Sequence, residues 1–244
     1  MSGTILTITG TGTSVGKTVV TAALAALAVD AGQRVAVVKP GQTGVRGDDL
    51  GDVDDVRRLA GVADTYELAR FSDPLAPAAA ARIAHVPPID VAEVARQIRE
   101  IAEDHDLVLV EGSGGLLVEF DDQHHSIADI AQDLGSDSVV VIAPNLGTLN
   151  HTALTLEVMR HRGLALAGVI IGSWPKNPDL SCCTNLDDIE SIAGEPLSGA
   201  IRENRAKLGK SEFLEAARKG LAPKFGGEFD AADFRQRFDY RRIE

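Results

Sequence analysis

Apolar residues gather in short runs along the chain, with few polar residues inside them. These runs are rich in Val and Ile and cover residues 4–10, 34–44, 106–115, 138–147 and 166–174. A strand buried on both faces is apolar throughout, whereas a strand with one solvated face alternates apolar and polar residues. The pattern therefore predicts central strands of a sheet that is covered on both sides. The runs end in turns that begin at Gly10, Lys39, Glu111, Asn145 and Gly172.

Helical patterns fall between the apolar runs. Residues 17–31 are rich in alanine and precede Gly32, a residue type common after helix C-termini. Residues 90–103 carry apolar positions at helical spacing, with Asp90 as the expected N-cap, and residues 151–162 form a third helical pattern. Alternating strands and helices predict an α/β fold with a doubly wound, mostly parallel sheet in three layers. Such a fold binds ligands at the carboxyl ends of its strands.

The pattern changes near the C-terminus, although no linker or repeat divides the chain. Four of the seven phenylalanines lie here, namely Phe225, Phe229, Phe234 and Phe238. We expect residues 205–244 to be a variable helical segment that packs on the rest, so that residues 1–244 form a single domain. A helix that binds a membrane surface or a partner is the alternative.

Composition and charge limit the classes of function. The formal net charge of −12 disfavours binding to nucleic acids and to anionic membranes, because both require a basic surface. The two cysteines, Cys182 and Cys183, are adjacent, which predicts no disulfide and a reducing compartment. The sequence shows no signal-peptide pattern and no apolar run of membrane-spanning length, and it predicts a cytoplasmic protein.

The sequence GTGTSVGKT, residues 10–18, is close to a phosphate-binding loop. The strict pattern G-x-x-x-x-G-K-[ST] has its first glycine at position 11, where this chain has threonine. An apolar run precedes the segment and an alanine-rich helix follows it, which is the context that such a loop requires. We expect Lys17 to contact the β- and γ-phosphates and the Thr18 hydroxyl to bind Mg²⁺. The alternative is a glycine-rich turn that binds nothing.

Two strand ends supply further candidates for this site. Glu111 is followed by GSGG and stands where a strand-terminal acid would bind Mg²⁺. Lys39 precedes Pro40 and would neutralise charge on a phosphoryl group during its transfer. A second metal-binding acid must come from residues 46–55, whose five aspartates are not distinguished by their spacing. A turn acid and a structural lysine are the alternative interpretations of Glu111 and Lys39.

Taken together, four segments resemble dethiobiotin synthetases: GTGTSVGKT, VVKPGQTG, LVEGSGGLLVE and LGTLNHTALT. The resemblance runs from about residue 4 to residue 174 and implies a P-loop NTPase architecture, in which a threonine at position 11 is ordinary. It implies a ligase of biotin biosynthesis that uses ATP and Mg²⁺. CO₂ forms a carbamate on one amine of 7,8-diaminopelargonic acid, and the γ-phosphoryl group moves to the carbamate oxygen. The second amine then closes the ureido ring, which gives dethiobiotin, ADP and phosphate.

The resemblance also assigns roles to individual residues. The catalytic positions match Lys39 and Lys17, and the metal-binding positions match Thr18, Asp52 and Glu111. Alignment on the RRLAG that follows selects Asp52, while Asp48 and Asp49 stay open because this loop varies in length. The nucleotide-binding positions match Gly12, Thr13, Ser14, Val15, Gly16, Lys17, Thr18, Val19, Asp52, Glu111, Gly112, Ser113, Gly114, Gly172, Ser173, Arg202, Glu203 and Asn204. The substrate-binding positions match Thr13, Lys39, Thr43, Gly114, Leu146, Gly147, Leu149 and Asn150.

Residues 145–152, NLGTLNHT, match the segment whose backbone amides bind the substrate carboxylate at a helix N-terminus. In the family this segment comes from the neighbouring subunit, so the resemblance implies a homodimer. His151 lies within the segment, and we expect it to serve as a cap or interface residue rather than in catalysis.

The chain departs from the family pattern at the base of the nucleotide. Many members carry Asn-Asp after the strand that matches AGVII, and that asparagine reads the adenine edge, whereas this chain has Gly172 and Ser173. Residues 201–206 also lack a proline that is common in the later base-contacting segment. Because glycine has no side chain to discriminate bases, we expect relaxed nucleotide selectivity.

Two other functions fit the phosphate-binding loop. A partitioning or septum-positioning ATPase is the first, although such proteins usually carry a second lysine early in the loop, where this chain has Thr11 and Gly12. The aromatic and arginine-rich C-terminal segment is the feature that favours this alternative. An amidotransferase-type cobyrinic acid synthetase is the second, but the chain is too short to include a glutaminase domain.

Overall fold

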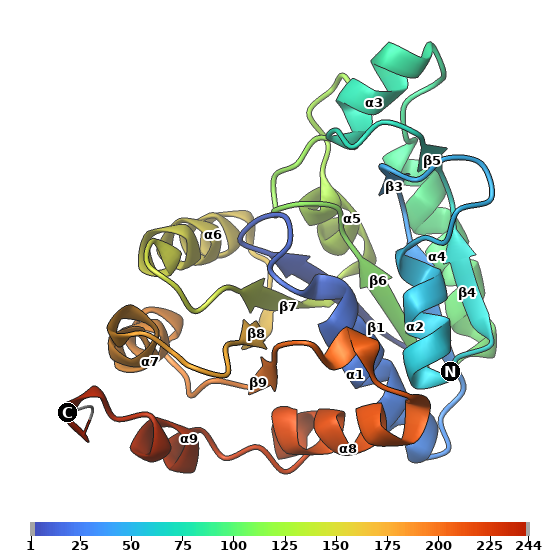
Figure 1. The fold of residues 1–244 in the computed structure, drawn as a ribbon. Helices are drawn as coiled ribbons and strands as arrows, with labels where there is room; N and C mark the ends of the chain where they lie inside the picture. Colours follow the sequence, from blue (N-terminus) through green and yellow to red (C-terminus); the bar gives the residue numbers. More distant parts are fainter. Residues whose placement is uncertain (1–2, 243–244) are drawn as a thin grey trace.

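A sheet of seven strands forms the centre of the computed structural model, which describes residues 3–242 (Figure 1). Its strands lie in the order β4-β2-β6-β1-β7-β8-β9, and every neighbouring pair is parallel. In this order the strands are Asp64–Glu67, Val35–Lys39, Leu107–Glu111, Thr4–Gly10, Asp137–Ile142, Leu166–Trp174 and Gly199–Arg202. The doubly wound parallel sheet expected from the sequence is confirmed.

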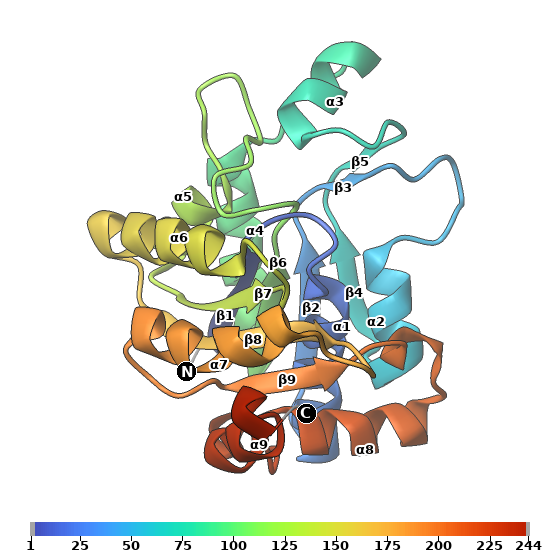
Figure 2. The same cartoon turned by 60° about the vertical axis from the view of Figure 1, so that its left-hand side comes forward.

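Helices cover both faces of the sheet, so that the fold has three layers (Figures 1 and 2). One face packs against α1 (Lys17–Asp30), α2 (Asp52–Ala60) and α8 (Lys210–Gly220). The other packs against α4 (Val91–Asp104), α5 (Ile127–Leu134), α6 (Thr148–Arg162) and α7 (Leu180–Ala193). Figure 2 shows α3 (Pro77–Ala84) standing out at the end opposite α8 and α9 (Ala231–Arg237). Short 3₁₀ helices cover Arg205–Lys207, Pro223–Phe225 and Tyr240–Arg242.

Burial explains why the apolar runs lack alternation. All five residues of β2 are buried, and so are the last five of β1 and of β7. Alternate side chains enter opposite layers: Val38 and Val110 face the α4 layer, whereas Val37 and Leu109 face the α1 layer. Full burial of one such side chain contributes about 1.5–3 kcal/mol. Both faces of the strands therefore contribute to the core.

Several element boundaries differ from the predicted ones. The run at 34–44 is divided at Pro40, which lacks the N–H that a strand requires. The short strand β3 (Gln42–Thr43) pairs instead with β5 (Arg70–Phe71) in a separate two-stranded sheet. β7 ends at Ile142 rather than near Asn145, and β8 continues two residues past Gly172.

Other elements begin elsewhere than predicted or were missed. α6 begins at Thr148 rather than at residue 151. Its N-cap is Gly147, which has a left-handed backbone conformation with a φ of 97°. α1 ends at Asp30 with Ala31 as its C-cap, one residue before the expected Gly32. The strands β4 and β9 lie at the edges of the sheet and carry the sequences DTYE and GAIR, which are too short to appear as apolar runs. The expected N-cap Asp90 is confirmed, since its side chain accepts a hydrogen bond from the Glu93 N–H.

Aromatic residues near the C-terminus pack on the core, as expected. Phe229 and Phe234 are buried, and the rings of Phe234 and Phe238 lie 5.0 and 4.9 Å from that of Trp174 at the end of β8. Such ring pairs contribute about 0.5–1.5 kcal/mol beyond their burial. Among the residues that the structure describes, no helix is long and apolar enough to cross a bilayer.

The carboxyl ends of β1, β2 and β6 meet at one edge of the sheet. From β1 the chain crosses to β2 on one side and later reaches β7 on the other side, so the strand order reverses around β1. A parallel sheet opens a ligand crevice at the carboxyl ends of its strands where the order reverses. The turns after these three strands therefore converge on one region.

Candidate active site

Residues 10–18 connect β1 to the N-terminus of α1. Left-handed backbone falls at Ser14 (φ 61°) and Gly16 (φ 99°), and not at Thr11. A threonine is therefore accommodated where the strict motif has glycine. The Thr11 N–H donates to the Val141 carbonyl at 3.0 Å, which ties the start of the loop to β7. Amides in the first turn of α1 have no intrahelical acceptors and can bind an anion.

Lys17 lies across this loop. Its Nζ donates to the Gly12 carbonyl at 2.9 Å, and only 7% of the residue is exposed. Burial lowers the pKa of Lys17, Glu111 and Asp52 partly oppose this effect and the charge of Lys39 adds to it, so that the pKa is about 8. A buried ammonium group in this position is suited to bind a negatively charged phosphate.

Lys39 holds two carboxylates together at the end of β2. Its Nζ lies 2.6 Å from Asp52 Oδ2 and 2.9 Å from Glu111 Oε1, and it donates to the Gly112 carbonyl at 3.3 Å. The residue is 3% exposed. Burial disfavours its charged form, but Glu111 and Asp52 outweigh this effect and raise the pKa of Lys39. Lys39 is therefore a fixed positive charge inside the site.

Of the aspartates in residues 46–55, Asp52 reaches the site. It is the first residue of α2, and its carboxylate contacts Lys39. Asp48 and Asp49 are exposed in the preceding loop and do not line the cavity. The geometry therefore supports Asp52, the aspartate that alignment on RRLAG selects.

Three oxygen-bearing side chains converge at the ends of β1 and β6. The Thr18 hydroxyl donates to Glu111 Oε1 at 2.8 Å, and Asp52 faces the same lysine as Glu111. Glu111 is 2% exposed. Residues 3–242 contain no cluster of three or more His, Cys, Asp and Glu side chains suited to a metal. Two carboxylates and a hydroxyl nevertheless fit Mg²⁺, which commonly takes one or two carboxylates and completes its shell with phosphates and water.

A cavity of about 340 Å³ connects these groups. It is lined by Thr13, Ser14, Gly16, Lys17, Thr18, Val19, Lys39, Gln42, Thr43, Asp52, Glu111, Ser113 and Gly114. Every one of these residues except Gln42 was predicted from the sequence. Gln42 precedes Thr43 in the QTG segment, and that adjacency was the signal that could have identified it.

The loop after β6 closes one side of the cavity. The Ser113 hydroxyl donates to the Gly41 carbonyl at 2.5 Å, which joins this loop to the turn after β2. Gly112 packs tightly, since a Cβ there would lie 3.0 Å from the Ile127 side chain. Gly114 has a φ of 68°, a conformation that favours glycine. Gly112 thus packs against Ile127 of α5, whereas Ser113 and Gly114 line the cavity.

Several other predicted nucleotide-binding residues lie outside this cavity. The Val15 side chain is buried in the core, and Gly12 borders a neighbouring groove. Gly172 packs against the phosphate loop, because a Cβ at this position would lie 2.1 Å from the Val15 carbonyl oxygen. The sequence predicted that Gly172 faces the base and cannot discriminate it for lack of a side chain. The structure shows instead that the Val15 backbone leaves no room for a side chain at this position.

The ends of β8 and β9 are joined beyond the phosphate loop. The Glu203 N–H donates to the Trp174 carbonyl at 2.8 Å, and the Glu203 side chain accepts from the Lys176 N–H at 2.9 Å. Ser173 and Arg202 are exposed beside this junction, and Asn204 adopts left-handed backbone. The predicted base-contacting segments are therefore neighbours, although they do not line the cavity.

The predicted carboxylate-binding segment also lies outside the cavity. Leu146 is 84% exposed, and Gly147 and Asn150 are exposed at the start of α6, beside the partly buried Leu149. An apolar groove of about 400 Å³ runs between the phosphate loop and α6, with Leu117 and Leu154 among its lining residues. This surface therefore borders the site from outside.

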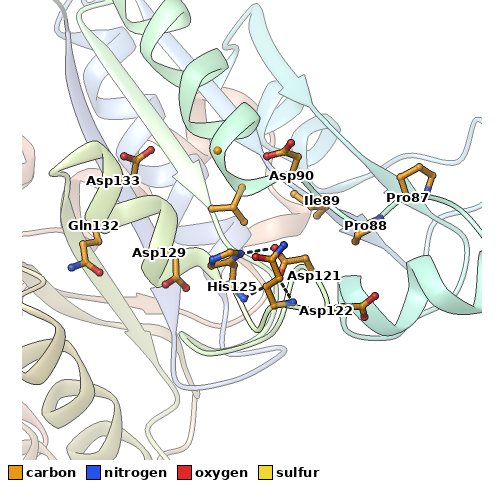
Figure 3. Close-up of a pocket in the computed structure, with 13 residues that line it drawn as sticks. Pro87, Pro88, Ile89, Asp90, Asp121, Asp122, His125, Asp129, Gln132 and Asp133 are labelled. Carbon is orange, nitrogen blue, oxygen red and sulfur yellow. Dashed lines mark hydrogen bonds and ion pairs between the residues drawn. The ribbon is translucent and has the colours of Figure 1, made fainter.

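A larger cavity, of about 920 Å³, lies elsewhere and is strongly acidic (Figure 3). Five aspartates line it, namely Asp90, Asp121, Asp122, Asp129 and Asp133. His125 Nδ1 lies 2.7 Å from Asp121 Oδ2, and this hydrogen bond raises the pKa of His125. A lining of this charge repels phosphates, so we locate the candidate site at the smaller cavity.

Comparison with known proteins identifies close relatives in sequence. A family model described as an AAA domain matches residues 4–210. The ATP-dependent dethiobiotin synthetase BioD of Parafrankia sp. (strain EAN1pec) is 55% identical, and the alignment covers 96% of this chain and 98% of the relative. The enzyme of the same name from Frankia casuarinae is 54% identical, with 97% and 99% covered, and that from Streptomyces avermitilis is 52% identical, with 96% and 98% covered.

Similar solved structures are more distant. The cell division ATPase MinD of Pyrococcus furiosus has a TM-score of 0.55 at 20% identity, covering 99% of this chain and 98% of that one. A ParA family ATPase from Chlorobium tepidum has a TM-score of 0.58 at 14% identity, with 92% and 96% covered. At these identities the similarity establishes the α/β P-loop fold alone.

Proposed function

The chain belongs to the family of ATP-dependent dethiobiotin synthetases, and we propose that the cavity at its phosphate loop carries out the family's ligase reaction. The substrates are ATP, CO₂ and 7,8-diaminopelargonic acid. The observation that carries this assignment of residues is the convergence of Lys17, Lys39, Thr18, Asp52 and Glu111 on one small cavity. We further propose that residues 1–244 act as one domain in the reducing cytoplasm, consistent with the two free, buried cysteines.

The phosphate loop and Lys17 bind the triphosphate in this proposal. The loop and the first turn of α1 line the cavity, and their backbone amides bind phosphate oxygens. Lys17 exchanges its present acceptor, the Gly12 carbonyl 2.9 Å away, for the β- and γ-phosphates. The segments at 172–173 and 202–204 lie beyond the loop and are the proposed contacts of the base.

Mg²⁺ is the proposed metal, held by Thr18, Asp52 and Glu111. These residues supply one hydroxyl and two carboxylates, which suits an ion that keeps several water and phosphate ligands. When bound, Mg²⁺ supplies positive charge to the phosphate oxygens. Because the same carboxylates contact Lys39, the bound Mg²⁺ would lie beside this lysine. Mg²⁺, Lys39 and Lys17 would then be the three cationic groups around the transferring phosphoryl group.

Lys39 is the proposed catalytic cation. The reaction moves the γ-phosphoryl group to the carbamate oxygen, and negative charge must be neutralised while it moves. The buried Lys39 ammonium lines the same cavity as the phosphate loop and Thr43, the proposed substrate contact, and remains charged because of its two carboxylates. Ring closure then follows when the second amine attacks the carbamic–phosphoric anhydride and expels phosphate. These two steps require no protein nucleophile, because the attacking groups are the carbamate oxygen and the second amine of the substrate.

We propose that the substrate carboxylate binds to the α6 N-terminus of a second copy of the chain. Gly147, Leu149 and Asn150 present this helix end at the surface, away from their own chain's cavity. Leu117 and Leu154 are exposed and line the apolar groove beside α6, which a homodimer would bury together with the exposed Leu146. Such an arrangement joins the two halves of the substrate site across the interface.

The partitioning ATPases share the fold but are the weaker functional candidate. The dethiobiotin synthetase relatives are 52–55% identical over nearly the whole chain, whereas MinD is 20% identical. The C-terminal aromatic residues that favoured this alternative pack on Trp174 instead of forming a free amphipathic surface.

The test is phosphate release in the presence of ATP, Mg²⁺, bicarbonate and 7,8-diaminopelargonic acid. We expect release to depend on the diamine and dethiobiotin to form in equal amount. ATP hydrolysis that ignores the diamine but responds to lipid vesicles or DNA would support the ATPase alternative instead.

A further inference from the structure

A buried glutamine beside the candidate metal site contacts the metal-binding aspartate. Gln42 is 5% exposed and lines the cavity together with Lys39. Its side-chain oxygen accepts a hydrogen bond from the Asp52 N–H at 2.9 Å, across ten positions of sequence. We propose that Gln42 is a positioning residue that orients Asp52 toward a divalent cation. This inference rests on the proposed function, which assigns Asp52 to Mg²⁺.

Asp52 follows an exposed loop and begins a helix whose first amides need acceptors. Residues 46–50 are exposed, and α2 begins directly after them at Asp52. The amides of a first helical turn lack intrahelical acceptors, and a side chain at the N-cap normally satisfies one of them. Here the N-cap is Gly51, which has no side chain. From a different element, Gln42 provides an acceptor for another amide of this turn, the Asp52 N–H.

Gln42 is itself held firmly. Its N–H donates to the Ala69 carbonyl at 2.8 Å, and its Nε2 donates to the Thr43 carbonyl at 3.1 Å. In the small sheet of β3 and β5, Gln42 is the register partner of Arg70. The Arg70 side chain donates to the carbonyls of Gly47 and Asp49 at 3.0 and 2.8 Å. The same pair of residues therefore holds both the loop and its end. Figure 1 shows this loop leading from β3 to α2.

The close approach of the loop explains the glycine at position 51. A Cβ on Gly51 would lie 2.8 Å from Glu67 Oε2 and 3.2 Å from Gln42 Oε1. A larger residue would displace the ends of these two side chains, and movement of Gln42 Oε1 would break its hydrogen bond to the Asp52 amide. The Asp52 carboxylate, which now lies 2.6 Å from Lys39 Nζ, would then lose its fixed direction.

The experiment measures how strongly Mg²⁺ enhances nucleotide binding. ATP affinity is determined by calorimetry without the diamine, once with EDTA and once with Mg²⁺, and the ratio of the two affinities is the enhancement. Gln42→Met keeps the shape of the side chain but loses the acceptor, whereas Gln42→Glu keeps an acceptor oxygen. We expect Gln42→Met to reduce the enhancement roughly 10–100-fold, as loss of a residue that orients a metal ligand does, while binding in EDTA stays unchanged. Gln42→Glu should retain the enhancement.

Asp52→Asn and the double variant separate this inference from the proposed function. Asp52→Asn should abolish the enhancement, and adding Gln42→Met should cause no further loss, because both changes act on one ligand. An enhancement that survives Asp52→Asn, or that is lost in the exposed Asp49→Asn control, would overturn the metal assignment itself. If Asp52→Asn removes the enhancement but Gln42→Met does not, the positioning role is wrong. The positioning role is equally wrong if Gln42→Met weakens ATP binding in EDTA as much as it weakens ATP binding with Mg²⁺. It is also wrong if Gln42→Glu loses the enhancement as Gln42→Met does.

Discussion

Replacement of Lys39 by methionine removes a buried charge while keeping most of the apolar length of the side chain. We expect turnover to fall about 10²–10³-fold, the loss typical when one preorganised group that stabilises developing negative charge is removed. Nucleotide affinity should stay close to that of the wild type, because Lys17 and the loop amides remain in place. This separation identifies a group that acts in the transition state.

The structure also gives the expected loss of stability. Lys39 Nζ lies 2.9 Å from Glu111, which is 2% exposed and would keep only the Thr18 hydroxyl as a side-chain donor. Removal of one partner from a buried ion pair costs about 3–5 kcal/mol. The lower end applies here, because 35% of the Asp52 side chain is exposed. In a domain of this size, about 3 kcal/mol lowers Tm by about 6–12 °C.

The assay must therefore be run well below the Tm of the variant. Diamine-dependent phosphate release gives turnover, calorimetric titration gives nucleotide affinity, and thermal unfolding gives stability. The matched control is Lys219→Met, at an exposed lysine of α8, which should change none of the three. Turnover that is unchanged in Lys39→Met would reassign Lys39 to a structural role. Equal losses of turnover and nucleotide affinity would show that Lys39 binds the nucleotide and does not act mainly in the transition state.

Four further predictions concern the loop, the base, the interface and pH. Lys17→Ala should lower nucleotide affinity and turnover together, by roughly 10-fold or more, the contribution of a charge-assisted hydrogen bond, and intact affinity in a titration would contradict this. Competition binding of ATP, CTP and GTP should show little preference among the bases, and a strong preference for ATP would exclude relaxed selectivity. Leu154→Asp should shift the protein from dimer to monomer in analytical ultracentrifugation and lower turnover at low protein concentration, whereas an unchanged dimer would place the interface elsewhere. Asp121 raises the pKa of His125, so this pair stabilises the fold below the unfolded pKa of about 6.5 and loses that effect as pH rises through the raised value. His125→Asn should therefore show a smaller fall in Tm between about pH 6 and about pH 8 than the wild type, and an equal fall would show that the pair does not matter.

The parts of the site that lie at strand ends could be predicted from the sequence. Lys39 and Glu111 each follow an uninterrupted apolar run, and a buried parallel strand produces that pattern because both of its faces enter the core. The carboxyl ends of such strands share one edge of the sheet, so the convergence of Lys39 and Glu111 also followed from the pattern. Their separation of 2.9 Å confirms it.

Features that depend on contacts between distant segments could not be predicted. The spacing of the five aspartates did not identify Asp52. The Asp52 amide bonds to Gln42, and Gln42 belongs to a two-residue strand that is too short to predict from the sequence. The role of Gly172 was likewise hidden, since the contact that excludes a side chain comes from Val15 in the phosphate loop. Edge strands such as β4 stay partly exposed and lack the apolar run that identified the central strands.

The most direct test of the account is phosphate release by the wild-type chain with and without 7,8-diaminopelargonic acid, at saturating ATP, Mg²⁺ and bicarbonate. The proposed chemistry predicts release only when the diamine is present, with one phosphate formed for each dethiobiotin. Release at the same rate without the diamine would contradict the central claim, because the γ-phosphoryl group would then move to water rather than to a carbamate.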